Sequence, residues 1–466
     1  MTLPGTETQP LRVAIVGAGP TGFYATDQLL KQAGLVAEVD MFDRLPTPYG
    51  LVRAGVAPDH QKIKSVTAAF EKVAAHPRFR FFGGVELGTH VTVADLRQHY
   101  HQLFYCTGAQ TDRRMGIPGE DLAGSHPATE FVAWYNGHPD YRDLPFDLSQ
   151  ERAAVVGVGN VAVDVARILC RTHDELLGTD MADHALEALR KSRIKEVYLL
   201  GRRGPAQAAF TNPEIKELGE LADADIGVRP EEVALDDLSR AALERDPDRA
   251  TTKKVEILHG YALRGPSGKM RMLTVRFLVS PVELIGNSAG EVVAMRLVKN
   301  TLRATATGTL QPKPTDQFEE LPVGLVFRSV GYRGVPLPGV PFNESWAVIL
   351  NEKGRVLDPG TKQPLAGEYT GGWIKRGPTG VIGTNKPDAA ETVACMVEDL
   401  AQGLTLHPAA PSAEAAERLI RERQPRFFSF QDWLRLNELE MGRGRAVGRP
   451  RVKFTRVEEM LQALGR

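Results

Sequence analysis

The segment LRVAIVGAGPTG (Leu11–Gly22) sets the architecture of the first part of this 466-residue chain. A short β-branched run leads into glycines at 17, 19 and 22, and a helix-forming stretch, FYATDQLLKQ, follows them. In such a strand–turn–helix unit, Gly17 makes the tight turn, Gly19 lets the backbone approach a pyrophosphate, and Gly22 lets the helix pack on the strand. The N–H groups at the start of the helix then point toward the anionic oxygens. The segment therefore predicts a dinucleotide-binding fold.

A second apolar strand, predicted over Val36–Phe42, strengthens this interpretation. The strand runs into Asp43, 21 residues after Gly22, where a carboxylate can accept hydrogen bonds from ribose hydroxyl groups. Asp40 competes for the same role, but Asp43 fits the end of the strand better. The alternative is a glycine turn that serves only the packing of the helix on the strand.

The same pattern recurs at Ala153–Ala162, AAVVGVGNVA, and predicts a second dinucleotide-binding fold. Gly157 and Gly159 are spaced like the first two glycines of the first motif, and Ala162 replaces the third. The next strand of this second unit is predicted over Glu196–Leu200.

Two arginines follow that strand, in the place where an NAD site would carry an acidic residue. They lie in the run GRRG, Gly201–Gly204. The guanidinium groups of Arg202 and Arg203 can bind a 2′-phosphate with bidentate geometry, so the second fold is predicted to take NADPH rather than NADH. The alternative is a solvated basic turn without a ligand.

Two dinucleotide-binding folds in one chain indicate two cofactors that face each other across a cleft. A flavin and a nicotinamide form the natural pair, because hydride passes between their rings and the cofactors carry the chemistry. Since the arginines place NADP(H) in the second fold, FAD is predicted in the first. Two apolar runs that lead into glycine, YCTGA at Tyr105–Ala109 and RSVGY at Arg328–Tyr332, are predicted as the points where the chain crosses between the units.

Charge and cysteine usage exclude several other classes of protein. Lysine plus arginine (57) nearly equals aspartate plus glutamate (58), giving a net charge of −1, so general binding to nucleic acid is not predicted. Cys106, Cys170 and Cys395 lie far apart and form no CxxC motif, which argues against a metal site, an iron–sulfur cluster or a redox dithiol. A reducing cytoplasm fits this usage best. Neither secretion nor membrane insertion is expected, because the N-terminus lacks a signal pattern and no apolar stretch reaches ~18 residues.

Three further segments are predicted from composition and spacing. A helical insertion within residues 173–192 accounts for the long interval before Arg202. Residues 219–252, rich in charged side chains without clear apolar alternation, are expected to form surface loops and short helices. Residues 405–416, TLHPAAPSAEAA, have linker composition and are predicted to connect the first fold to a terminal appendage.

Four longer runs add a family resemblance. They are LPTPYGLVRAGVAPDH (Leu45–His60), GVGNVAVDVARIL (Gly157–Leu169), GRRGPAQAAFTNPEIKEL (Gly201–Leu218) and GWIKRGPTGVIGTNK (Gly372–Lys386). These runs resemble, in the same order, ferredoxin–NADP reductases of the adrenodoxin-reductase type, and the resemblance covers essentially the whole chain. It implies an α/β fold with two Rossmann-like domains in a glutathione-reductase-like architecture: a discontinuous FAD-binding domain (1–110 and 334–466) and an NADPH-binding domain (111–333). The implied activity is hydride transfer from NADPH to FAD, then single-electron transfer to a ferredoxin-type iron–sulfur protein.

The resemblance also implies which residues contact the cofactors. For FAD they are Gly22, Asp43, Leu51, Leu87, Trp373 beside the isoalloxazine, and the backbone of Gly380, Val381 and Ile382 at the flavin edge, where N–H donors can stabilise a reduced anion. For NADPH they are Val158, Gly159, Asn160, Val161, Arg202, Arg203 and Glu214, with Gly380 near the nicotinamide. The alternative for Trp373 is core packing.

His60 and Glu217 resemble the active-site ionic pair of this family. A carboxylate beside an imidazole raises the pKa of the imidazole and holds a proton near the flavin. Without the resemblance, His60 would be interpreted as a turn residue. Glu214 and Glu217 also have an alternative role, because both lie on a helix predicted to begin near Pro213, where acidic side chains favour the positive end of the helix dipole.

The electron acceptor is expected to be a separate protein, because the chain has no cysteine cluster for an iron–sulfur domain of its own. The sequence also shows no mitochondrial presequence, so the expected location is the cytoplasm. The stretch Met441–Phe454 carries five basic residues and no acid, and an acidic ferredoxin could dock there by electrostatic steering. The alternatives are a solvated basic loop and pairing with neighbouring acids.

Two other functions stay open on the sequence alone. An NADPH diaphorase or quinone reductase would keep both cofactors and change the acceptor. A sensor or scaffold would bind FAD without turnover. Reduction of a disulfide by thiol relay is disfavoured, because the chain has no dithiol motif.

Overall fold

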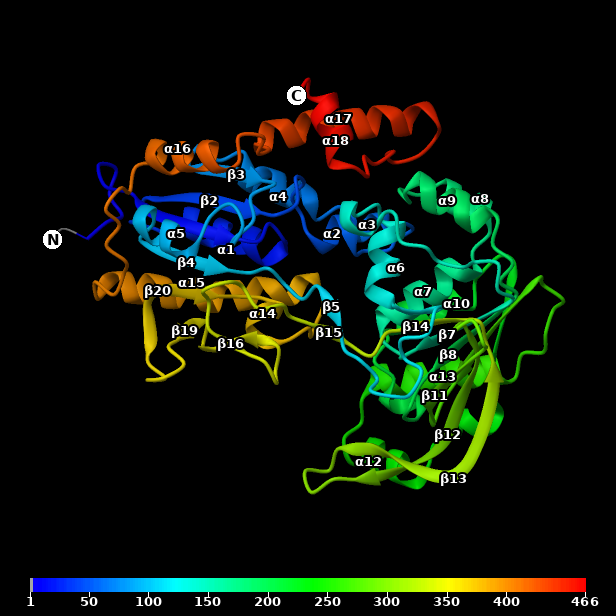
Figure 1. The fold of residues 1–466 in the computed structure, drawn as a ribbon. Helices are drawn as coiled ribbons and strands as arrows, with labels where there is room; N and C mark the ends of the chain where they lie inside the picture. Colours follow the sequence, from blue (N-terminus) through cyan, green and yellow to red (C-terminus); the bar gives the residue numbers. More distant parts are fainter. Residues whose placement is uncertain (1–2) are drawn as a thin grey trace.

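Two β-sheets, each flanked by helices, form the two lobes of the computed structural model, which describes residues 3–466 (Figure 1). The sheet of the first lobe has the strand order β18-β19-β20-β4-β1-β2-β3. It is parallel from β20 to β3 and antiparallel at the β18 edge. Its strands are β1 (Leu11–Val16), β2 (Ala37–Asp43), β3 (Phe79–Gly83), β4 (Gln102–Tyr105), β18 (Asn351–Glu352), β19 (Arg355–Leu357) and β20 (Pro364–Thr370).

The sheet of the second lobe is parallel throughout, in the order β6-β14-β7-β8-β10-β9. The strand predicted over Glu196–Leu200 is β8, with the same bounds. Two open parallel sheets with helices on their faces confirm the predicted α/β fold with two Rossmann-like domains. The other strands are β6 (Ser125–Pro127), β7 (Arg152–Val156), β9 (Ala224–Val228), β10 (Arg271–Arg276) and β14 (Leu325–Arg328).

β9 is an edge strand that the sequence did not predict. It lies within residues 219–252, which were expected to contain only loops and short helices, and it pairs with β10. Its buried and partly exposed residues alternate over only five positions, which is too short a pattern to stand out among charged neighbours. The expected helices follow it as α11 (Pro230–Val233), α12 (Asp237–Arg245) and α13 (Arg249–Ala262).

Both glycine-rich segments form a strand, a turn and a helix, as predicted. β1 leads through Gly17 into α1 (Pro20–Leu30), and β7 leads through Gly157 into α7 (Asn160–Cys170). Gly17 and Gly157 have φ values of 114° and 133°, conformations that residues with a Cβ rarely adopt. Each helix therefore begins at the carboxyl end of its parallel strand, where ligands bind in folds of this type.

The chain passes between the two lobes twice, and the two passes are hydrogen-bonded to each other. β4 ends at Tyr105 and β14 ends at Arg328, where the predicted crossover runs begin. Beyond these points β5 (Thr111–Asp112) pairs antiparallel with β15 (Tyr332–Arg333). Figure 1 shows the pair between the lobes. The two cofactor turns thus belong to separate lobes joined by one paired connection.

The C-terminal helices belong to the core of the first lobe, and the predicted appendage is therefore wrong. Trp433 and Leu436, on α17 (Phe430–Ala446), lie in the same buried cluster as Ile15 on β1 and Phe23 on α1. The linker composition before α17 suggested a separate unit, but its apolar face completes the core. The neighbouring helices are α16 (Ala413–Arg423) and α18 (Val457–Ala463).

The basic stretch Met441–Phe454 mostly pairs with acidic side chains, one of the alternatives left open by the sequence. Three of its cations point inward, whereas Arg443 and Arg445 are exposed. The partners come from α17 itself and from the predicted helical insertion, which forms α8 (His173–Leu177) and α9 (Asp183–Arg190). The inward ion pairs are Arg449–Asp183 at 2.5 Å, Arg451–Glu440 at 3.1 Å and Lys453–Asp180 at 3.3 Å.

Asp180 is a buried anchor between the lobes. Its carboxylate lies 2.7 Å from the Nζ of Lys64 and 3.3 Å from the Nζ of Lys453. Burial alone would raise its pKa, but the two ammonium groups lower it to about 2. We expect Asp180→Asn to lower the free energy of unfolding by about 3–5 kcal/mol, because two buried cations lose their counter-charge. Urea unfolding followed by circular dichroism checks this, and Asp174→Asn, at an exposed site, is the control; equal losses in both variants would contradict it.

The remaining elements cover the sheets and extend the second lobe. An antiparallel sheet, β11-β12-β13, projects from that lobe (Figure 1). No helix within residues 3–466 has both the length and the apolar character needed to cross a membrane. The remaining elements are α2 (Leu51–Ala54), α3 (Gln61–Lys64), α4 (Thr67–Ala74), α5 (Val93–His99), α6 (Ala128–Tyr135), α10 (Asn212–Leu218), α14 (Trp373–Arg376), α15 (Asn385–Ala401), β11 (Val279–Gly286), β12 (Val292–Ala304), β13 (Leu310–Pro322), β16 (Phe342–Asn343) and β17 (Val348–Ile349), with 3-10 turns at Pro139–Tyr141, Pro205–Gln207 and Ile382–Thr384.

Candidate functional site

The two glycine turns leave open space beside a helix N-terminus in each lobe. A Cβ added to Gly19 or Gly159 would meet no protein atom within 4 Å. By contrast, a Cβ on Gly17 would lie 2.5 Å from the carbonyl oxygen of Cys106, and one on Gly157 would lie 2.1 Å from that of Ser329. The first glycine of each motif thus allows the backbones to pass, and the second leaves room where a phosphate group can approach the helix N–H groups.

The third glycine of the first motif has a packing role. A Cβ on Gly22 would lie 2.4 Å from the carbonyl oxygen of Gly17 and 3.3 Å from the side chain of Ile15. Helix α1 therefore approaches β1 more closely than any side chain would permit. In the second motif the buried Ala162 holds the equivalent position.

The structure separates the two acidic candidates at the end of β2. The carboxylate of Asp43 accepts hydrogen bonds from the N–H groups of Ala18, at 2.8 Å, and Leu45, at 2.9 Å, so it lies beside the first glycine turn. Burial raises the pKa of Asp43. Asp40 instead binds Arg12 and Arg80 inside the sheet. Of the two, only Asp43 therefore lies at the first glycine turn.

Arg202 and Arg203 follow β8 without an acidic partner. Arg202 is exposed and Arg203 is half-buried, and neither takes part in any ion pair recorded among residues 3–466. Burial and the neighbouring Arg202 lower the pKa of Arg203. Two uncompensated guanidinium groups at the end of a strand fit a dianionic phosphate.

The second glycine turn is tied directly to helix α10. The carbonyl oxygen of Val158 accepts hydrogen bonds from the N–H groups of Ala209 and Phe210, both at 2.9 Å. The Oδ1 of Asn160 accepts one from the N–H of Thr211, also at 2.9 Å. Val161 packs against the core of the second lobe. These contacts hold α10, which carries Glu214 and Glu217, next to the turn.

His60 and the two glutamates meet where the lobes meet. His60 precedes α3 in the first lobe, and its Nε2 lies 2.9 Å from Glu217 Oε2. Its Nδ1 lies 4.0 Å from Glu214 Oε1. The structure thus brings His60 next to two glutamates that lie more than 150 positions after it in the sequence.

A cluster of charged residues that was not predicted from the sequence lies behind this pair. Arg167, on α7, binds Asp59 at 2.7 Å and Asp164 at 2.7 Å, and Arg171 binds Asp59 at 2.8 Å. The signal was present, because Asp164 and Arg167 interrupt the otherwise apolar helix run NVAVDVARIL. Buried charges in such a run need partners, although the run does not say which.

The cluster shifts the pKa values of its carboxylates in opposite directions. Burial, followed by repulsion from Asp164, raises the pKa of Glu214 to about 7. Burial also raises the pKa of Asp164. For Asp59 burial acts in the same sense, but its contacts with Arg167 and Arg171 outweigh it and lower the pKa well below the usual range. Near neutral pH the Glu214 carboxyl group is therefore close to the midpoint of its titration.

On the side of the first lobe, Trp373 packs near the predicted flavin segment. Its ring centre lies 5.3 Å from that of Tyr332, and its Nε1 donates to the carbonyl oxygen of Thr379 at 3.0 Å. This bond places the turn at Gly380, with a φ of 80°, beside the indole. Val381 is 58% exposed. The turn Gly380–Ile382 therefore presents backbone groups at the surface of the junction.

Leu51 and Leu87, two other predicted flavin contacts, differ in their exposure. Leu51 begins α2 and is exposed, directly after Gly50, whose added Cβ would lie 3.1 Å from the Cα of Gly19. The side chain of Leu87 is buried in a core cluster, so any contact from this residue to a cofactor would have to use its backbone.

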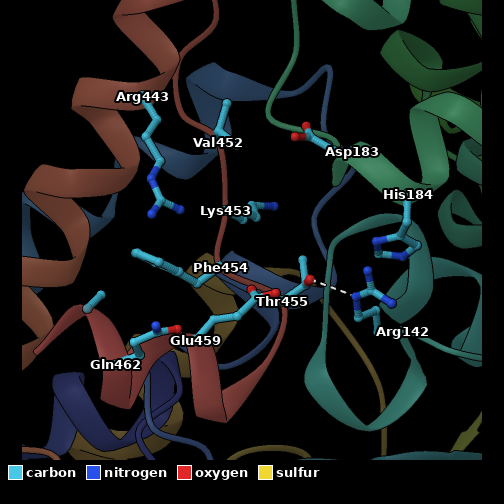
Figure 2. Close-up of a pocket in the computed structure, with 11 residues that line it drawn as sticks. Arg142, Asp183, His184, Arg443, Val452, Lys453, Phe454, Thr455, Glu459 and Gln462 are labelled. Atoms are coloured by element: carbon cyan, nitrogen blue, oxygen red, sulfur yellow. Dashed lines mark hydrogen bonds between the residues drawn. The ribbon is translucent and has the colours of Figure 1, made fainter. Parts of the chain in front are cut away.

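A cavity of about 450 Å³ lies between α9 and the C-terminal segment, away from the predicted residues (Figure 2). Two of its polar groups have protein partners: Arg142 Nε donates to Thr455 Oγ1 at 2.9 Å, and Lys453 pairs with Asp180. The guanidinium of Arg443 stacks over the ring of Phe454. The cavity thus forms part of the contact between the lobes.

Comparisons with known proteins point to one family. A family model described as pyridine nucleotide-disulphide oxidoreductase matches residues 11–218. The probable ferredoxin/ferredoxin--NADP reductase of Mycobacterium tuberculosis is 46% identical over 98% of this chain and 76% of its own length. NADPH-ferredoxin reductase FprA of Mycobacterium leprae is 46% identical over 97% of both chains.

A plant relative and a solved structure agree with these matches. The mitochondrial NADPH:adrenodoxin oxidoreductase of Arabidopsis thaliana is 39% identical over 98% of this chain and 96% of its own. The structure of Mycobacterium tuberculosis FprA in complex with NADPH has a TM-score of 0.92 and 45% identity, covering 98% of this chain and all of that one. The chain therefore belongs to the ferredoxin–NADP reductases of the adrenodoxin-reductase type.

Proposed function

We propose that this protein is an NADPH-dependent flavoenzyme that passes electrons to a ferredoxin-type iron–sulfur protein. Bound FAD would supply the ability to take two electrons from NADPH and to release them one at a time. The observation that carries the proposal is the 2.9 Å contact between His60 and Glu217, because it joins two lobes that each carry an open dinucleotide turn. Its full-length relatives include NADPH-ferredoxin reductases.

The first lobe has the features that FAD requires. The open space at Gly19 suits a pyrophosphate, and Asp43 suits a ribose. Trp373 and the turn Gly380–Ile382 lie on the side of the junction where the ring would be bound. We assign FAD to residues 1–110 and 334–466. The further FAD contacts proposed are Gly17, Gly22, Leu51 and Leu87.

The second lobe has the features that NADPH requires. The open space at Gly159 suits its pyrophosphate, and the unpaired Arg202 and Arg203 suit its 2′-phosphate. We assign NADPH to residues 111–333. The further NADPH contacts proposed are Gly157, Val158, Asn160, Val161 and Glu214, with Gly380 of the first lobe near the nicotinamide.

The catalytic role proposed for His60 and Glu217 is to hold a proton at the junction of the lobes. The Nε2 of His60 and the Oε2 of Glu217 share a hydrogen bond, so one proton is held between an imidazole and a carboxylate. A proton in this position can balance negative charge that develops next to it. No nucleophile is required of the protein.

The partner is proposed to be a separate, acidic iron–sulfur protein, and the enzyme is proposed to act in the cytoplasm. Arg443 and Arg445 are the exposed cations that the basic C-terminal stretch offers to such a partner. Free, buried cysteines fit a reducing compartment. Neither statement depends on the chemistry at His60.

The acceptor is tested by reoxidation of the NADPH-reduced enzyme. We expect fast reoxidation by ferredoxin and slow reoxidation by a quinone, both followed as recovery of the flavin absorbance. Faster reaction with the quinone would favour a diaphorase. Failure of NADPH to bleach a flavin-loaded sample would favour the sensor interpretation.

The affinity for NADP⁺ is expected to depend on the ionisation of Glu214. Because the pKa of Glu214 is about 7, the carboxylate becomes charged as the pH rises from 6 to 8. The charged form accepts stronger hydrogen bonds and attracts the positive nicotinamide ring, so we expect binding to tighten about three- to tenfold. Titration calorimetry at several pH values checks this. The 2′-phosphate of NADP⁺ also titrates, but it does so in the same way with the wild type and with Glu214→Gln. If NADP⁺ binding had the same pH dependence in both proteins, the role of Glu214 would be contradicted.

A further inference from the structure

Arg167 connects every acidic group of the site through one guanidinium. Its side chain is fully buried, at 0% exposed. Beyond its bonds to Asp59 and Asp164, its Nη1 lies 3.2 Å from Glu214 and 3.5 Å from Glu217. Four carboxylates from three segments of the chain thus surround a single cation.

These contacts cross the junction in the same place as the proposed proton-holding pair. Asp59, in the first lobe, directly precedes His60, and both oxygens of its carboxylate receive hydrogen bonds from Arg167, at 2.7 and 3.0 Å. Glu217, in the second lobe, lies beside the other side of the guanidinium group, 3.5 Å from its Nη1. Arg167 therefore fixes the backbone on one side of the His60–Glu217 hydrogen bond and the carboxylate on the other.

Only an arginine can make this set of contacts. The guanidinium is planar and presents five N–H donors in a rigid fork. A lysine ammonium in the same space has one nitrogen, which cannot reach Asp59, Asp164 and Glu217 together. The arrangement of the carboxylates thus requires the shape of an arginine side chain as well as its positive charge.

The charge of the cluster also depends on Arg167. Four carboxylates face two guanidinium groups, and the second of these, on Arg171, contacts Asp59 and Glu175 but none of the other three. The Arg167 charge lowers the pKa of Glu214, against the burial that raises it. The titratable and charged groups around this site are Asp59, His60, Tyr135, Asp164, Arg171, Glu214, Glu217 and Tyr332.

We propose that Arg167 is a positioning residue for the reaction: it holds the His60–Glu217 pair across the junction and sets the ionisation of the carboxylates beside it. This inference rests on the proposed function, but it concerns residues that the function itself does not require. Arg167 does not contact a reacting atom. It acts through His60 and Glu217.

The first test separates the charge of Arg167 from its shape. Arg167→Gln removes both, Arg167→Lys keeps the charge, and Arg171→Gln is the matched control because it also removes a guanidinium from Asp59. The readout is the midpoint of the pH dependence of NADP⁺ binding, which requires no turnover. We expect the midpoint to rise from about 7 to above about 8 in Arg167→Gln and to stay near 7 in Arg167→Lys and Arg171→Gln.

The second test measures the rate at which NADPH bleaches the flavin under anaerobic conditions. Both Arg167 variants lose the planar set of guanidinium N–H donors. We therefore expect NADPH to bleach the flavin about ten- to hundredfold more slowly in both, whereas the rate in Arg171→Gln changes less than about threefold. FAD content and melting temperature show whether each variant is folded. If Arg167→Gln does not fold, Arg167→Lys alone decides: a normal rate would overturn the proposal.

The two proposals fail in different ways. A wild-type enzyme that NADPH does not bleach would refute the proposed function. Folded Arg167 variants with the wild-type rate and the wild-type midpoint would refute only the role of Arg167. A slow Arg167→Lys enzyme with an unshifted midpoint, beside a slow Arg167→Gln enzyme with a raised midpoint, would support both parts of the inference.

Discussion

Arg202→Ala is expected to weaken NADPH binding about ten- to hundredfold and to leave NADH binding nearly unchanged. Removal of one charge-assisted contact to the 2′-phosphate costs about 1.5–3 kcal/mol, which corresponds to that factor in Kd. Arg202 forms no ion pair with any of residues 3–466, so its loss leaves no partner carboxylate unpaired there. The double variant with Arg203→Ala is expected to lose discrimination between the two coenzymes.

The measurement is the KM or Kd for both coenzymes in the wild type and in each variant. Arg190→Ala is the control, because this arginine on α9 is exposed and, within residues 3–466, forms an ion pair with Glu187 alone. The selectivity for NADPH should fall steeply with salt, since exposed guanidinium groups are screened. Equal losses for NADPH and NADH would show that the 2′-phosphate is bound elsewhere.

Gly19→Val is expected to give a folded protein without FAD. A Cβ at Gly19 meets no protein atom within 4 Å, so the fold tolerates the side chain. The added methyl groups fill the space proposed for the pyrophosphate, and this close backbone approach is what the second glycine of the motif permits. Purified Gly19→Val should therefore be colourless and should not take up added FAD.

Two matched variants make this result specific. Gly159→Val should remain yellow and lose NADPH binding, because it blocks only the second turn. Gly17→Ala should impair folding itself, since its Cβ would lie 2.5 Å from a carbonyl oxygen at a φ of 114°. Absorbance, circular dichroism and coenzyme titration distinguish the three. A yellow Gly19→Val protein with normal FAD affinity would place the cofactor elsewhere.

Local motifs explain why much of this fold could be predicted from sequence. The segments around Gly17 and Gly157 combine a strand, a strained turn and a helix within about 20 residues, and each step leaves a residue signature. Leu200, at the end of β8, is also marked by the change from an apolar run to GRRG. Such features depend on residues that are close together in the sequence, so they can be predicted before the fold is known.

Features that depend on distant partners were harder to predict. Asp40 and Asp43 look alike in sequence, and only the ion pairs of Asp40 with Arg12 and Arg80 separate them. Arg167 appears as one charged residue in an apolar helix, and its partners lie 108 positions before it and 47 after it. Its role emerges only when the lobes come together.

The C-terminal region shows the same limit. Residues 405–416 have the composition of a linker, yet α16 begins within them and α17, further along the chain, packs Trp433 into the core of the first lobe. The apolar face of α17 is buried because it meets the core of the first lobe. The periodicity of the helix sequence alone does not say which part of the protein will cover that face. Likewise, the inward orientation of Lys453 depends on Asp180, in an insertion from the other half of the chain.

Anaerobic addition of one equivalent of NADPH to the FAD-loaded protein is the most direct test that two coenzymes meet at the junction of the lobes. We expect the yellow absorbance to bleach within seconds, far faster than with NADH, and to return when oxidised ferredoxin is added. A spectrum that stays oxidised with NADPH, in protein that carries a full complement of FAD, would contradict electron transfer between the two sites.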